Sequence, residues 1–184
     1  MAATPAGTPA GERLLAAASE LFYRRGIRAV GVELIAEVAG TTKKTLYDRF
    51  GWKDALVALY LQRRALRWQE FLRGHLDRHP PGVARVLAVF DALDAWLDEQ
   101  DRGCAFVNAW AEIGGSDHPG VAVIRADKTW MHEIFVELVR DAGLRDVGPF
   151  LHLIYEGATV LVTAGDRPSA VAEARAAAGQ LMGG

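Results

Sequence analysis

The fold is decided by the stretch Leu34–Lys53, which reads LIAEVAGTTKKTLYDRFGWK. Its first residues, Val38 among them, place apolar side chains at helical spacing, and Gly40 then interrupts the run. Glycine supplies the positive φ of a tight turn, and the hydroxyl of Thr42 can accept a hydrogen bond from a free N–H at a helix start. The stretch therefore predicts two short helices joined by a turn, which is a helix-turn-helix motif.

The second helix of this motif predicts a DNA-facing surface. Leu46 and Phe50 should anchor it in a small core, while its other side chains are mostly hydroxyl-bearing or basic. Such groups can contact base edges or phosphates, although a lysine taken singly is equally typical of a solvated surface. We expect Lys44 to contact a guanine, and Tyr47 and Lys53 to anchor phosphates. The predicted DNA-binding residues are Thr41, Thr42, Lys43, Lys44, Thr45, Tyr47, Arg49 and Lys53.

Composition and charge are consistent with this interpretation. The 184 residues are 51% hydrophobic and 24% charged, as in an ordinary globular protein. Residues 1–79 hold 13 Lys/Arg against 8 Asp/Glu, whereas residues 80–184 hold 8 against 15, so only the first part suits a polyanion. No apolar run approaches the roughly 18 residues of a membrane span. The single cysteine, Cys104, excludes an intrachain disulfide framework and fits a reducing cytoplasm.

The whole chain predicts an all-α fold of about nine helices. Apolar periodicity and Gly/Pro breaks place helices at 12–25, 32–39, 43–49, 53–79, 83–99, 104–113, 119–142, 147–164 and 168–181. We expect a flexible tail at 1–11, a helix-turn-helix domain at 12–52 and a larger helical domain at 53–184.

The run IAEVAGTTKKTLYDRFGWKDAL, after a helix with a phenylalanine near its end, resembles the TetR family of bacterial transcriptional repressors. The later segments GCAFVNAWAE and DHPGV also resemble part of many family members. The resemblance implies three DNA-binding helices, a helical ligand-binding and dimerisation domain, and a dimer on a palindromic operator. Two departures concern phosphate contacts. Gly31-Val32 stand where family members often carry Ser or Thr, and Arg49 stands where a histidine is common.

Aromatic side chains with a few polar groups predict a site for a small hydrophobic or aromatic effector. By resemblance, this pocket lies between the helix at 53–79 and the next three helices. At helical spacing each aromatic is also typical of plain core, and that alternative stays open. The predicted effector contacts are Trp68, Phe71, Phe90, Phe106, Asn108, Trp110, Trp130 and Tyr155.

The last two helices predict a homodimer interface. One stripe is formed by Phe150, Ile154, Ala158 and Leu161, and the alanine-rich segment 170–178 would allow close helix approach. The expected function is a ligand-responsive repressor, with no catalytic residue, metal or cofactor. Two alternatives remain, a helical protein-interaction module and a thiol enzyme using Cys104. Of the five histidines only His75 and His79 are spaced i, i+4, and two ligands alone do not make a metal site.

Overall fold

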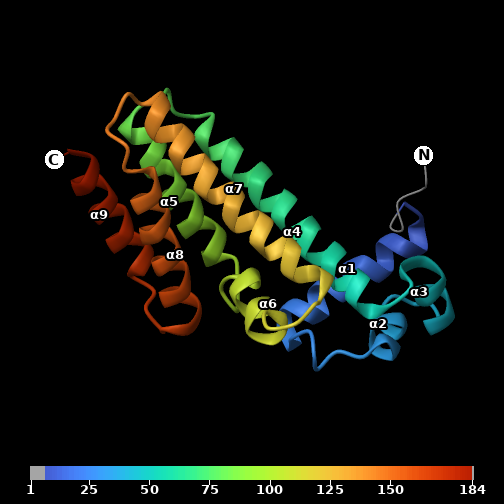
Figure 1. The fold of residues 1–184 in the computed structure, drawn as a ribbon. Helices are drawn as coiled ribbons and strands as arrows, with labels where there is room; N and C mark the ends of the chain where they lie inside the picture. Colours follow the sequence, from blue (N-terminus) through green and yellow to red (C-terminus); the bar gives the residue numbers. More distant parts are fainter. Residues whose placement is uncertain (1–6, 184) are drawn as a thin grey trace. The chain divides into compact units, whose positions relative to one another are not determined.

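The computed structural model describes residues 7–183, and within this range the chain is built from α-helices with no β-strand (Figure 1). The predicted all-α fold is confirmed, and the helix bounds lie within three residues of those expected. The described helices are α1 (Pro9–Arg25), α2 (Val32–Val38), α3 (Lys43–Phe50), α4 (Lys53–Leu76), α5 (Val83–Asp98), α6 (Ala105–Ile113), α7 (Pro119–Asp141), α8 (Gly148–Ala164) and α9 (Ala170–Gly183).

Helix α1 begins inside the segment that the sequence predicts as a flexible tail. Its N-cap is Thr8, whose hydroxyl accepts a hydrogen bond from the backbone N–H of Gly11 at 3.2 Å. Pro9 follows in the first turn, where a missing N–H costs the helix nothing. These two local signals extend the helix three residues beyond the predicted start at Glu12. The tail residues 1–6 lie outside the described residues.

The first of two compact units contains the described residues up to Arg64 together with Asn108–Ile124. It therefore holds α1, α2, α3, the first half of α4, the end of α6 and the start of α7. Leu14, Ile35 and Leu46, one from each of the first three helices, are fully buried and form its centre. Val38 differs from the prediction, since it is 55% exposed rather than directed inward. Helix α2 ends at this residue, so no further turn covers its side chain.

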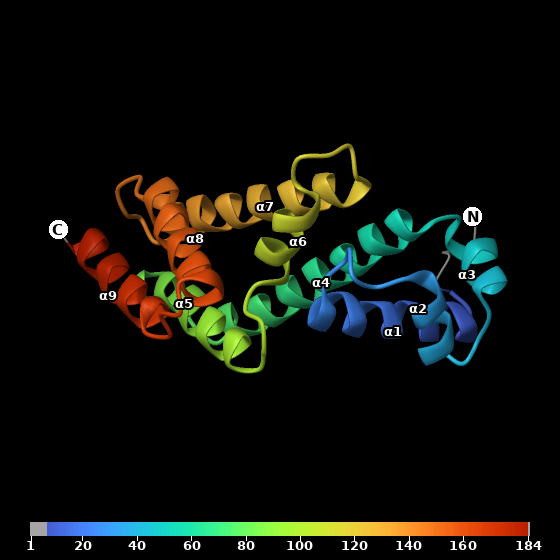
Figure 2. The ribbon, with the colours of Figure 1, turned by 90° about the horizontal axis from the view of Figure 1, so that it is seen from below.

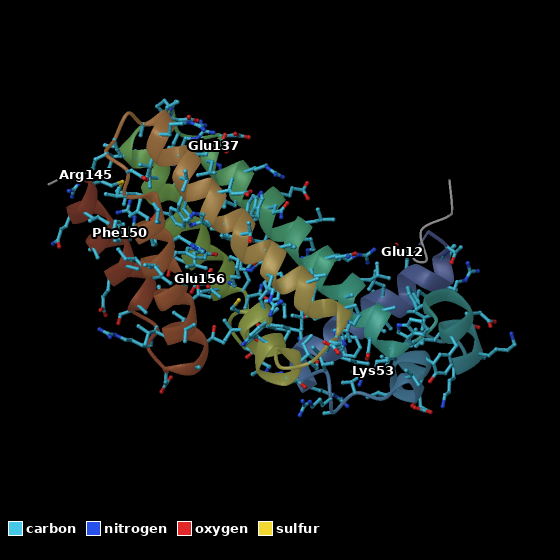
Figure 3. All side chains as sticks on the ribbon, in the orientation of Figure 1. Glu12, Lys53, Glu137, Arg145, Phe150 and Glu156 are labelled. Carbon is cyan, nitrogen blue, oxygen red and sulfur yellow. The ribbon has the colours of Figure 1, made fainter. Side chains whose placement is uncertain are left out.

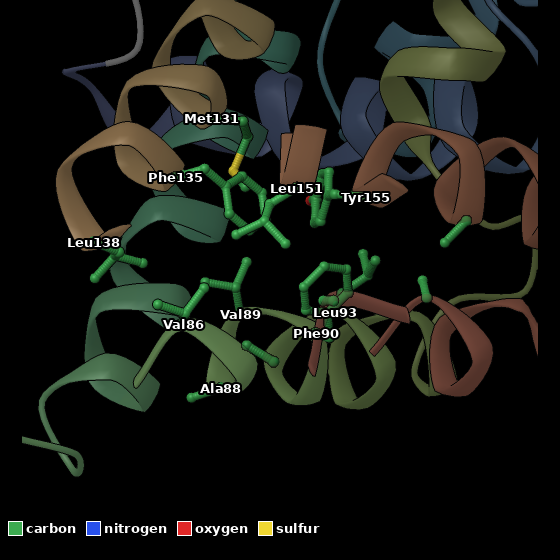
Figure 4. Packing of buried hydrophobic residues seen from close by; sticks show 14 of the residues in the cluster. Val86, Ala88, Val89, Phe90, Leu93, Met131, Phe135, Leu138, Leu151 and Tyr155 are labelled. Carbon is green, nitrogen blue, oxygen red and sulfur yellow. The ribbon is translucent and has the colours of Figure 1, made fainter. Parts of the chain in front are cut away.

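The second unit contains Ala65–Val107 and the described residues from Arg125 onward. Its core is assembled from α4, α5, α7, α8 and α9, and the rings of Phe90, Phe135 and Tyr155 pack together at the centre (Figure 4). Helix α9 lies alongside α5 and α8 (Figures 1 and 2). Helices α4, α6 and α7 each run from one unit into the other without a break.

Candidate nucleic-acid interface

The turn between α2 and α3 has the predicted geometry. Gly40 adopts φ 59°, a conformation that a side chain would disfavour. The backbone N–H of Thr41 donates to the carbonyl of Ala36 at 2.9 Å and closes the end of α2. Thr42 caps α3, because its hydroxyl accepts the N–H of Thr45 at 3.1 Å. The local sequence thus fixes where α3 starts, and with it which residues occupy its first turn.

Helix α3 turns a polar face to solvent. Leu46 and Phe50 are buried and hold the helix on the unit's core. Seven predicted DNA-binding residues lie in this motif, and all of them are exposed or half-buried: Thr41, Thr42, Lys43, Lys44, Thr45, Tyr47 and Arg49. The structure therefore leaves seven of the eight predicted residues accessible to solvent.

Both lysines of the first turn are paired with carboxylates of the same motif. Lys43 donates to Glu33 at the start of α2, and this contact raises the pKa of Lys43 and lowers the pKa of Glu33. Lys44 donates to Asp48 one turn along α3 at 2.7 Å. Exposed ion pairs of this kind contribute little to stability, so either lysine can exchange its carboxylate for another anion.

Lys53 occupies a different environment from the one predicted. Its Nζ donates to the backbone carbonyl of Ile27 at 2.6 Å and lies 5.8 Å from the ring centre of Phe22 (its place at the start of α4 is labelled in Figure 3). Burial lowers the pKa of Lys53, against the opposing charges of Asp54 and Glu112. A phosphate contact would require this ammonium group to leave the carbonyl. The structure therefore favours an internal bracing role over a phosphate anchor.

Trp52 was not among the predicted residues, although its side chain is 67% exposed beside this surface. It lies between Gly51 and the start of α4, so the periodicity of neither helix predicts whether its side chain is buried or exposed. An indole exposed to this degree is unusual in a folded domain, and its place after α3 is the only signal for a functional role.

The predicted effector residues are divided between the two units. Asn108 and Trp110 belong to the first unit, and the other six belong to the second. In the second unit Trp68 and Phe71 form a ring cluster with Trp96, with centroids 5.1 to 6.2 Å apart. Phe90 and Tyr155 are enclosed in the core, as the alternative reading expected.

A cluster of acids and bases joins α7 to α8 in the second unit. Lys128 Nζ lies 3.0 and 2.9 Å from the two carboxylate oxygens of Glu156, and His152 Nε2 lies 3.3 Å from the first of them. Lys128 and His152 help to lower the pKa of Glu156 against the effect of burial. Asp127 is 4% exposed, and burial raises its pKa to about 6.

A groove of about 270 Å³ also lies in the second unit, between the end of α4 and α7. None of the predicted effector residues lines it. Its lining residues are Arg73, Leu76, Asp77, Pro81, Arg85, Ile134, Glu137, Leu138 and Asp141. Within residues 7–183 no group of three or more His, Cys, Asp or Glu side chains could hold a metal ion. No helix in the same range combines the length and apolar character needed to cross a membrane.

The outer face of α8 is apolar, but it differs from the predicted stripe. Phe150 is 57% exposed and Leu153 is 68% exposed, with Val160 and Leu161 following on the same side (Phe150 is labelled in Figure 3). Ala158 is buried and Ile154 packs against the core, so these two predicted interface residues face inward. The periodicity located the helix correctly, and two of the four predicted interface residues, Phe150 and Leu161, are exposed.

Residues 14–60, which span most of α1 and all of α2 and α3, match the family described as bacterial regulatory proteins, tetR family. The solved structure of SCO4454, a TetR-family transcriptional regulator from Streptomyces coelicolor, has a TM-score of 0.83 at 27% identity. That likeness covers 96% of this chain and 97% of SCO4454. The fold of the whole chain is therefore that of a TetR-family regulator.

The chain is also similar in sequence to two further transcriptional regulators. The HTH-type transcriptional activator FasR of Mycolicibacterium smegmatis is 34% identical over 134 residues, which cover 72% of this chain and 60% of FasR. An uncharacterized HTH-type transcriptional regulator of Mycobacterium tuberculosis is 38% identical over 107 residues, which cover 58% of this chain and 53% of that protein. The chain thus spans little more than half the length of these two relatives.

Proposed function

We propose that this TetR-family chain is a transcriptional regulator that binds double-stranded DNA as a homodimer and responds to a small hydrophobic or aromatic effector. The observation that carries the proposal is the exposed face of α3. A capped helix presents hydroxyl and basic side chains from its first turn, which is the part of a recognition helix that meets base edges.

Within this proposal the residues of α3 divide into base and phosphate contacts. Lys44, whose side chain is 84% exposed, is assigned to a guanine. Lys43, Tyr47 and Arg49 are assigned to phosphates, which fix the register of the helix on the duplex. Thr41, Thr42 and Thr45 supply short hydroxyl contacts. Lys53 is left out of this set because its ammonium group already has the carbonyl of Ile27 as its partner.

We propose that the homodimer forms through the outer face of α8. Phe150, Leu153, Val160 and Leu161 expose large apolar side chains on one helix, and a second copy of the chain offers the same surface. A two-fold dimer carries two α3 helices, and it therefore requires two half-sites in inverted orientation. The operator is accordingly expected to be palindromic.

The proposed effector class rests on the aromatic content of the second unit. Phe71 and Trp96 are only partly buried, and their ring centroids are 5.1 Å apart. Such rings offer flat apolar surface to an aromatic or aliphatic molecule. A panel of hydrophobic compounds should therefore change the tryptophan fluorescence of the chain, with Trp68→Phe and Trp96→Phe identifying which indole reports. A signal that no compound changes would remove the effector from the proposal.

We further propose that DNA binding represses transcription and that the effector releases it. FasR is named as an activator, so activation is the second candidate for this chain. A promoter reporter carrying the operator distinguishes the two: deletion of the regulator raises expression under repression and lowers it under activation.

The central test is selection of bound duplexes from a random DNA pool with the full chain. The expected result is an enriched palindrome whose half-sites lie about one helical turn apart. Binding should weaken steeply as salt rises, because phosphate contacts release counterions. Recovery of no enriched sequence, together with equal binding to all duplexes, would contradict the proposal.

A further inference from the structure

The turn that follows α1 is held by a side chain from a distant part of the sequence. Glu112 lies near the end of α6, and its Oε1 accepts the backbone N–H of Ile27 at 2.8 Å. Its Oε2 accepts the N–H of Arg28 at 2.7 Å (α6 and the end of α1 are labelled in Figure 1). One carboxylate therefore satisfies two adjacent backbone donors, and both bonds are charge-assisted.

The same turn is held from its other side by α4. The peptide group joining Ile27 to Arg28 gives its N–H to Glu112, and its carbonyl oxygen accepts a hydrogen bond from Lys53 Nζ at 2.6 Å. Both polar atoms of one peptide group are thus occupied by charged side chains from two different helices. This peptide group is a junction between the C-terminal end of α1, the start of α4 and the end of α6.

Gly26 makes room for the carboxylate. It adopts φ +90°, and a Cβ at this position would lie 3.1 and 3.3 Å from Oε1 and Oε2 of Glu112. These distances are tighter than an ordinary contact, so a larger residue would displace the carboxylate as well as strain the backbone. The backbone conformation at Gly26 and the carboxylate at Glu112 are therefore matched to one another.

A second contact fixes the segment after α6 to the start of α4. The N–H of Gly120 donates to Nδ1 of His118 at 2.9 Å, which leaves the ring hydrogen on Nε2. That nitrogen lies 3.4 Å from a carboxylate oxygen of Asp54, and the His118 side chain is only 9% exposed. The residues that follow α6 thus lie against the start of α4 within the same unit.

We propose that Glu112 is a positioning residue for DNA binding. It fixes the conformation of the α1–α2 turn, and this turn determines the orientation of α2 and α3 on their core. Helix α6 is continuous from Ala105, in the second unit, to Ile113, in the first. The inference rests on the proposed DNA-binding function and assigns to the Glu112 carboxylate the placement of the turn that precedes α2.

The test uses three variants of the full chain. Glu112→Gln keeps the length of the side chain and removes its charge, and Glu112→Asp keeps the charge and shortens the reach. The matched control is Glu133→Gln, which removes an exposed carboxylate from α7 in the second unit. On charge alone, loss of a carboxylate should strengthen binding to DNA or leave it unchanged. A positioning role predicts the opposite for Glu112.

Two measurements decide between these outcomes. Fluorescence anisotropy with the selected operator should show affinity about 5- to 100-fold weaker for both Glu112 variants and unchanged for Glu133→Gln, which is the usual size of a coupling between sites. The slope of affinity against salt should stay as in the parent chain, because no phosphate contact is lost. Operator affinity within twofold of the parent, or tighter, would overturn the inference.

Hydrogen exchange of the DNA-free chain provides the second measurement. Exchange should accelerate at least tenfold at Ile27 and Arg28 in the Glu112 variants, and also rise across residues 32–50. Acceleration confined to the turn, or absent altogether, would overturn the positioning role. If the parent chain selected no duplex, the proposed function would fail, while exchange at 32–50 would still decide whether Glu112 fixes these helices.

Discussion

Asp127 on α7 is a buried carboxylate whose charge should destabilise the folded chain at neutral pH. It is 4% exposed, and its Oδ1 has no hydrogen-bond partner among the described residues. Burial raises its pKa from 3.8 to about 6; Lys128 and His152 act against this shift, and Glu156 adds to it. Because the folded pKa lies above the unfolded one, protonation stabilises the fold. This contribution is complete below about pH 3.8 and is lost as the pH rises through about 6.

The size of this effect on the free energy of unfolding follows from the shift of the Asp127 pKa. About two pKa units, at ~1.4 kcal/mol each, give an upper value of roughly 3 kcal/mol. Asp127→Asn keeps the size of the side chain and removes the charge, so the free energy of unfolding at pH 8 should rise by about 1–3 kcal/mol. The lower figure allows for the new amide, which meets the same unpartnered position. Near pH 4 the folded parent chain is already protonated at Asp127, and the two proteins should differ little.

Urea unfolding followed by far-UV circular dichroism at several pH values measures this difference. The chain concentration must be held fixed, because dimerisation would add to the apparent stability. Glu133→Gln on the same helix is the control and should show no pH-dependent difference. A gap between Asp127→Asn and the parent that stayed constant with pH would refute the reasoning. So would a variant less stable than the parent at pH 8, because Lys128 and His152 would then outweigh burial.

Three further predictions concern the proposed interfaces. Lys44→Ala should weaken binding to the selected operator by about 1–3 kcal/mol and leave random DNA less affected, as measured by anisotropy; equal losses on both would contradict base reading. Lys53→Ala should lower the free energy of unfolding by about 1 kcal/mol through loss of the Ile27 contact. The slope of log operator affinity against log salt concentration should stay unchanged in this variant. A slope smaller by about one would show that Lys53 contacts a phosphate after all. Leu153→Glu should convert the dimer to a monomer in sedimentation, whereas the same substitution at Leu66, exposed on α4, should not.

The helix-turn-helix could be predicted because its signals are local. Gly40 and Thr42 act on backbone groups within a few residues, and Leu46 and Phe50 follow a helical period that needs no knowledge of the rest of the chain. The same reasoning applied to α8 found the helix but placed only two of the four predicted interface residues, Phe150 and Leu161, on its exposed side. Periodicity indicates that a helix has an apolar face, but α8 has apolar residues on several sides, and only the packing of α7 and α9 decides which of them is covered.

Contacts between distant segments could not be predicted. Lys53 finds its partner 26 residues away, and Glu112 meets the α1–α2 turn across 84 and 85 residues. In both cases the partner is a backbone group, so no pattern of charged residues in the sequence indicates the contact. The burial of Asp127, with its Oδ1 lacking a hydrogen-bond partner, could not be predicted either, because an acid on a helix that carries several others is typical of a solvated face. These features depend on the tertiary fold.

The carboxylates beside the lysines of α3 bear on specificity. Binding to random DNA is almost wholly electrostatic, so Glu33 and Asp48 oppose it by pairing with Lys43 and Lys44 and by repelling nearby phosphates. A correct half-site adds base contacts that compensate for the loss of the lysine–carboxylate ion pairs, whereas an incorrect half-site does not. The acids should therefore reduce binding to random DNA more than binding to the operator. Replacing Asp48 with asparagine is accordingly expected to raise affinity for all duplexes while lowering the ratio between operator and random DNA.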